Sequence, residues 1–71
     1  MNISEKQSLK KALPMGWRIL IAKETGYSKS YITQVLSGER DSFIIERAAL
    51  KIAKNHREEI SIMEKLKAEI L

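Results

Sequence analysis

The stretch RILIAKETGYSKSYITQVLS, residues 18–37, decides how this chain folds. Ala22 lies four residues before Gly26, and Ser28 lies two residues after it. Ile32 and Val35 follow Gly26 at six and nine residues. This spacing predicts two short helices joined by one tight turn, the arrangement of a helix-turn-helix.

Each position has a physical reason. Gly26 can adopt a positive φ at little steric cost where the chain leaves the first helix. Ser28 suits the N-cap of the next helix, because its hydroxyl accepts a hydrogen bond from a free backbone N–H. Spacing of i, i+3 and i+4 places Ile32, Val35 and Leu36 on one face. We expect that face to pack against Ile21, Ala22 and Tyr27.

The segment AKETGYSKSYITQVLSG, residues 22–38, resembles the helix-turn-helix of the lambda-repressor/Cro (Xre-type) DNA-binding proteins. The segment SFIIERAALKIAK, residues 42–54, resembles the fourth helix of that fold, so the likeness covers about residues 17–54. Thr25 departs from the family, which usually has an aliphatic residue there. The resemblance implies an all-α, lambda-repressor-like bundle that reads DNA with its second motif helix in the major groove.

Five short helical segments are expected along the chain, with no strand. They cover residues 4–13, 17–25, 29–37, 43–54 and 58–70, and either Asp41 or Ser42 caps the fourth. We assign residues 1–57 to the DNA-binding domain. Residues 58–71 are expected to form a C-terminal helix. Its apolar face carries Ile60, Met63, Leu66 or Lys67, and Ile70, which recur at intervals of about 3.5 residues. This face either covers the core of its own chain or forms a homodimer.

Charge is unevenly distributed. Residues 1–57 hold eleven Lys and Arg against five Asp and Glu, whereas residues 58–71 hold two against four. The basic body favours a polyanion partner, and the acidic end argues against DNA contact there. The chain has no cysteine, no long apolar run and no signal-peptide pattern. We therefore expect a cytoplasmic protein with no membrane partner.

Catalytic and metal-binding chemistry is not predicted. His56 is the only histidine, and no carboxylate or thiol accompanies it at ligand spacing. Phosphate loops, nucleophile triads and zinc patterns are missing from the sequence. We predict a protein that is not an enzyme, with no cofactor and no small-molecule substrate. Trp17 and Tyr27 are expected to serve packing.

The outward face of the second motif helix carries the candidate base contacts. At 100° per residue it presents Ser30 and Gln34, flanked by Thr33 and Tyr31. Lys29 lies at the N-terminal tip of this helix, and the family resemblance implies that this tip points into the groove. A Gln side chain can form hydrogen bonds with N6 and N7 of adenine, and a Lys side chain can donate to O6 and N7 of guanine. A Ser or Thr hydroxyl can bind either base. The family resemblance implies phosphate contacts at Arg18 and Arg40, and we assign Ser28 and Ser37 to the phosphate backbone as well.

The sequence thus predicts a small transcriptional regulator that binds double-stranded DNA, with a possible homodimer through its last helix. Two other functions stay open. One is a protein–protein adaptor or antitoxin-like module that uses the helix-turn-helix only as a scaffold. The other is an accessory DNA-architectural factor of the excision type. Salt dependence of binding to random and selected duplexes separates a DNA reader from an adaptor.

Overall fold

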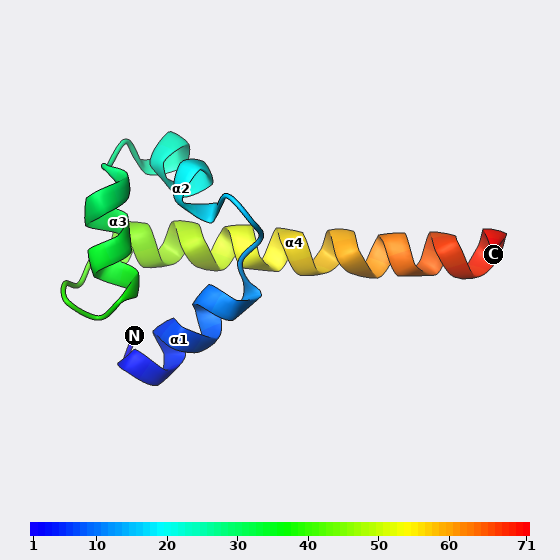
Figure 1. Cartoon of the computed structure of the whole chain (residues 1–71), viewed down its shortest axis with the longest axis horizontal. Helices are drawn as coiled ribbons and strands as arrows, with labels where there is room; N and C mark the ends of the chain where they lie inside the picture. The colour runs from blue at the N-terminus through cyan, green and yellow to red at the C-terminus, as the bar shows by residue number, and fades with distance from the viewer.

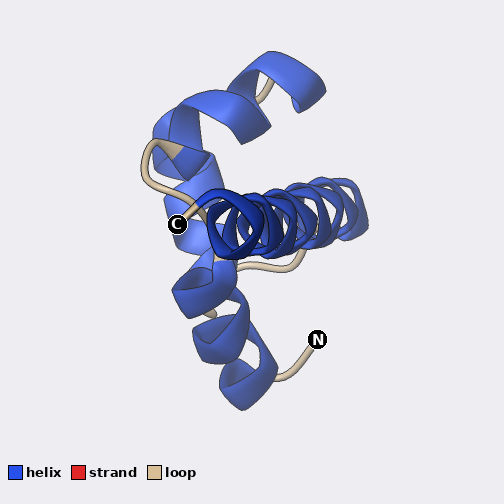
Figure 2. Ribbon diagram, turned by 90° about the vertical axis from the view of Figure 1, so that its right-hand side faces the viewer, coloured by secondary structure: helices blue, strands red, loops and turns tan.

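Four helices and no strand make up the computed structural model, which describes residues 1–71. In chain order they are α1 (Ile3–Ala12), α2 (Trp17–Thr25), α3 (Lys29–Leu36) and α4 (Phe43–Ile70). The first three gather around the N-terminal half of α4, and the rest of α4 extends away from them (Figure 1). The view along α4 shows the short helices on two sides of it, with the C-terminus free (Figure 2).

The expected five helices are corrected to four, because the two C-terminal segments form one helix. α4 runs without interruption for 28 residues, through Asn55, His56 and Arg57. Asn55 and His56 lower helix propensity by only a few tenths of a kcal/mol relative to better helix formers, and Arg57 is itself a good helix former. No glycine or proline lies in α4. Nothing therefore outweighs the backbone hydrogen bond that each further residue adds.

The first helix starts one residue earlier than expected, at Ile3, because a capping box precedes it. The side chain of Asn2 accepts a hydrogen bond from the backbone N–H of Glu5, and the Glu5 carboxylate accepts one from the backbone N–H of Asn2. These two bonds satisfy N–H groups that have no partner inside the helix. The helix ends at Ala12, ahead of Pro14.

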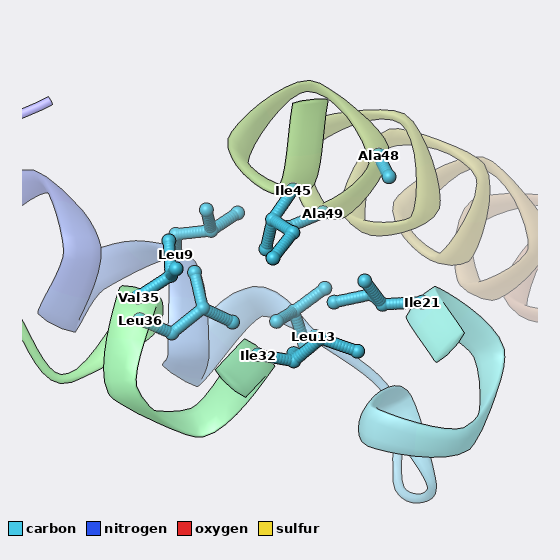
Figure 3. Packing of buried hydrophobic residues seen from close by; sticks show 9 residues of the cluster. All are labelled: Leu9, Leu13, Ile21, Ile32, Val35, Leu36, Ile45, Ala48 and Ala49. Atoms are coloured by element: carbon cyan, nitrogen blue, oxygen red, sulfur yellow. The ribbon is translucent and has the colours of Figure 1, made fainter. Parts of the chain in front are cut away.

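Nine buried apolar residues form one core where the four helices meet (Figure 3). They are Leu9 and Leu13 from the first helical segment, Ile21 from α2, Ile32, Val35 and Leu36 from α3, and Ile45, Ala48 and Ala49 from α4. Trp17, Ala22 and Ile52 pack against this core as half-buried neighbours. The alanines let α4 approach the other helices closely, as its stripe of apolar residues predicts.

The C-terminal half of α4 does not cover this core. Residues 57–71 are all exposed, including the apolar Met63 and Ile70. The alternative in which this segment folds back over its own chain is therefore not what the structure has, because a continuous helix cannot reverse direction. No helix combines the length and the hydropathy needed to cross a membrane.

Candidate nucleic-acid interface

Local hydrogen bonds define the turn between α2 and α3. Gly26 has φ 80° and ψ 0°, and its N–H donates to the carbonyl of Ala22 at 2.8 Å. The Thr25 hydroxyl donates to the carbonyl of Ile21 at 2.7 Å and accepts the N–H of Tyr27 at 3.3 Å. Thr25 thus ties the end of α2 to the turn. The positive φ expected for Gly26 is confirmed.

The helix after the turn starts as predicted. The Ser28 hydroxyl accepts the N–H of Tyr31 at 3.2 Å, which makes Ser28 the N-cap of α3. The Tyr31 ring lies 5.2 Å from the Tyr27 ring, centroid to centroid. Tyr27 is exposed and packs on this neighbour instead of entering the core, so its expected contact with the buried face of α3 is corrected. An aromatic pair on the surface keeps the phenolic oxygens in water.

The two faces of α3 differ sharply in chemistry. Ile32, Val35 and Leu36 are buried with at most 1% of their surface exposed. The other side holds the exposed Lys29 and Ser30 and the half-buried Tyr31, Thr33 and Gln34. No acidic residue lies on α3. The predicted inward and outward faces of this helix are confirmed.

Arg18 joins the start of α2 to the polar face of α3. Its Nε donates to Oγ1 of Thr33 at 3.0 Å, and that hydroxyl in turn donates to the carbonyl of Lys29 at 2.9 Å. The guanidinium carbon lies 4.2 Å from the centroid of the Trp17 ring. Stacking on an aromatic ring restricts a long side chain. Arg18 is therefore held beside α3 while remaining exposed.

Arg40 makes the matching contact from the loop after α3. Its Nε donates to Oε1 of Gln34 at 3.0 Å. Its backbone N–H also donates to the carbonyl of Gln34 at 3.3 Å. Since Arg40 occupies the amide oxygen, the amide N–H groups of Gln34 remain free to donate outward. Two cations thus lie against the polar face of α3, one held by Thr33 and one by Gln34.

A buried lysine anchors that loop to the rest of the protein, and nothing in the sequence pattern indicated it. The Lys6 side chain is only 3% exposed. Its ammonium donates to Oδ1 of Asp41 at 2.9 Å and to the carbonyl of Arg40 at 3.0 Å. It also lies 3.5 Å from Oε1 of the buried Glu46. Lys6 therefore fixes the backbone at Arg40 from the opposite side of the loop.

The same contacts shift two pKa values. The hydrogen bond to Asp41 raises the pKa of Lys6 above its usual 10.5, although burial of the ammonium acts in the opposite direction. The hydrogen bond from Lys6 lowers the pKa of Asp41 below its usual 3.8. Both groups are thus charged at neutral pH, which keeps the loop anchored.

The structure brings most of the sequence-predicted residues onto one surface and leaves some outside its hydrogen bonds. Arg18, Thr33, Gln34 and Arg40 are linked in two pairs. Lys29 and Ser30 are exposed, and their side chains make no hydrogen bond within the chain. The Ser28 hydroxyl accepts the N-cap hydrogen bond, which leaves its O–H group able to donate. Ser37 is exposed at the C-cap of α3, and its N–H donates to the carbonyl of Thr33 at 2.9 Å.

Elsewhere the structure holds little reactive chemistry. Nowhere do three His, Cys, Asp or Glu side chains come together as metal ligands. An open groove of about 510 Å³ lies between α1 and α4. Half of its ten lining residues are hydrophobic, among them Ala12 and Leu50, and the polar half includes Glu5, Lys54 and Arg57.

No family model, curated protein or solved structure matches this chain. What the molecule does is therefore inferred from the geometry of α2, the turn, α3 and the loop that follows.

Proposed function

We propose that this protein binds double-stranded DNA in a sequence-specific manner and acts as a small transcriptional regulator of the lambda-repressor/Cro type. α3 is the recognition helix, and it enters the major groove. The observation that carries this proposal is the acid-free polar face of α3, against which hydrogen bonds hold the side chains of Arg18 and Arg40. The phosphate backbones border the major groove, so cations beside a helix that enters it can contact phosphate oxygens.

The side chains on that face support base recognition. Lys29 and Ser30 are exposed near the N-terminal end of α3, which is the end that contacts base edges in this type of motif. Gln34 presents its amide N–H groups outward, because Arg40 engages its oxygen. N7 of adenine or guanine and O6 of guanine accept such donors. We assign base contact to Lys29, Ser30, Tyr31, Thr33 and Gln34.

Backbone contact is assigned to the flanking residues. Arg18 and Arg40 are each positioned by a hydrogen bond that uses Nε, which leaves the terminal guanidinium N–H groups free for phosphate oxygens. Ser28 and Ser37 lie at the two ends of α3 and complete this set. The Lys6 anchor supports the same role, since it fixes the backbone at Arg40.

The test selects bound duplexes from a random library and then measures affinity by fluorescence anisotropy. Gln34→Ala is expected to weaken the preferred site by roughly 1–3 kcal/mol and to relax selection at one or two base pairs. Asn55→Ala is the matched control, because it removes an exposed amide from α4, well away from α3. A Gln34 variant with full affinity and an unchanged selected motif would contradict the assignment of this residue.

Salt dependence decides between DNA binding and an adaptor role. A DNA reader loses affinity steeply as salt rises and binds its selected site more tightly than random duplex. A protein–protein module shows neither property. An absence of binding to any duplex at low salt would refute the proposed function.

A further inference from the structure

The apolar face that α4 uses to close the core continues past the domain with nothing over it. Met63 follows Ile45 by eighteen residues, which is five helical turns, and Ile70 follows seven residues later. Both therefore lie on the same side of α4 as the buried Ile45. Yet Met63 is 60% exposed and Ile70 is 80% exposed. Figure 1 shows this half of the helix extending away from the other three.

Four residues near Met63 are arranged symmetrically about it, whereas His56 and Ile70, seven residues away in the two directions, differ in chemistry. Glu59 lies four residues before Met63, and Lys67 lies four residues after it. At 100° per residue each is about 40° from the direction of Met63, on opposite sides. Ile60 and Leu66 lie three residues away in the two directions, farther out on the same face. An acidic residue, Glu59, and a basic residue, Lys67, thus lie on opposite sides of the apolar Met63.

We propose that a second copy of this chain covers this face, with the two C-terminal halves of α4 antiparallel and a two-fold axis beside Met63. In that arrangement a residue four positions before Met63 is level with one four positions after it on the other copy. Glu59 of each copy therefore lies beside Lys67 of the other, and the two Met63 side chains meet at the centre. The Ile60 and Leu66 side chains flank this contact, and the pairing removes their apolar surface from water.

Charge decides the direction of this pairing. A parallel pair in register would place Glu59 beside Glu59 and Lys67 beside Lys67, and like charges at an interface disfavour association. The antiparallel pair replaces both repulsions with attractions. The segment is therefore complementary to itself, which favours a second copy over an unrelated partner.

Other occupants fit less well. DNA is disfavoured because residues 58–71 hold four acidic and two basic side chains. The chain's own domain is out of reach, because α4 is continuous from Phe43 to Ile70. The pairing does not depend on DNA binding, so its failure and the failure of the proposed function are separate results.

The experiment is sedimentation of the full chain over a micromolar concentration range, with circular dichroism to verify that each variant is folded. Wild type is expected to be a reversible dimer. Glu59→Lys or Lys67→Glu alone places like charges side by side twice and is expected to weaken the dimer roughly five- to thirtyfold. The double variant Glu59→Lys/Lys67→Glu exchanges the two charges and is expected to restore wild-type affinity. Lys65→Glu, a charge reversal on the opposite side of α4, is the control and leaves the affinity unchanged.

Three results would overturn the proposal. A wild-type chain that stays monomeric at several hundred micromolar has no second copy on this face. A dimer that resists both single charge reversals is not antiparallel about Met63, because in a parallel pair each reversal only replaces one like-charge contact with another. A dimer that survives Met63→Glu in a folded chain is formed by a different surface, such as the groove between α1 and α4.

Discussion

Replacement of Gly26 tests the turn that orients α3. Gly26 has φ +80°, and a Cβ built there would meet no atom within 4 Å. Crowding is therefore not the penalty for Gly26→Ala, and only the left-handed backbone opposes a side chain. That conformation costs an L-residue about 1–2 kcal/mol, and the lower entropy of the unfolded variant offsets about 0.4–1 kcal/mol. The net loss is between roughly 0 and 1.6 kcal/mol.

The loss of stability should depend on which residue replaces Gly26. Asn tolerates the left-handed region, so Gly26→Asn is expected to lose less stability than Gly26→Ala. Gly26→Val is expected to lose more than about 1 kcal/mol, because a β-branched side chain is strained there. A domain of this size shifts in Tm by about 4–8 °C per kcal/mol, so Val should melt at least roughly 4 °C below wild type.

Urea unfolding with a constant m-value is the assay, because a change in midpoint alone reports stability. Gly16→Ala is the matched control. Gly16 has φ +81° and is equally open, so the same net loss is expected at a glycine outside the turn. A Gly26→Val variant that unfolds at the wild-type midpoint would refute the left-handed turn, and the orientation assigned to α3 would lose its basis.

Two further predictions concern the borders of the interface. Arg18→Ala and Arg40→Ala should each weaken binding to selected and random duplexes alike. Each should also reduce the slope of log binding constant against log salt concentration by about 0.9, whereas Arg57→Ala, which removes an exposed cation from α4, should leave that slope unchanged. An unchanged slope in both test variants would show that these arginines do not contact the phosphate backbone. Because the folded-state pKa of Asp41 is lowered, its ion pair with Lys6 contributes fully above pH 3.8 and is lost as the pH falls through the folded value. The stability difference between wild type and Asp41→Asn should therefore narrow below pH 3.8, and a constant difference measured by urea unfolding would contradict this role.

The unit of α2, the turn and α3 was predictable because short-range chemistry specifies it. A glycine that leaves a helix, a serine that caps the next one and apolar residues at i, i+3 and i+4 act within a few residues of each other. The bounds of α2, the positive φ of Gly26 and the buried face of α3 are accordingly confirmed, and α3 ends one residue earlier than predicted, at Leu36. The predicted number of helices was wrong, because Asn55 and His56 weaken a helix without breaking it.

Tertiary structure alone decided how the candidate interface is assembled. Arg18 is hydrogen-bonded to Thr33, 15 residues away in the sequence, and Lys6 is hydrogen-bonded to Asp41, 35 residues away. Such pairs depend on how the helices pack, and no local pattern in the sequence encodes them. The sequence by itself determined which residues α3 turns outward, since helical periodicity follows from the backbone. Packing then determined that Arg18 and Arg40 border that face, that Lys6 is buried to anchor the loop, and that the apolar face of α4 continues beyond the core it covers.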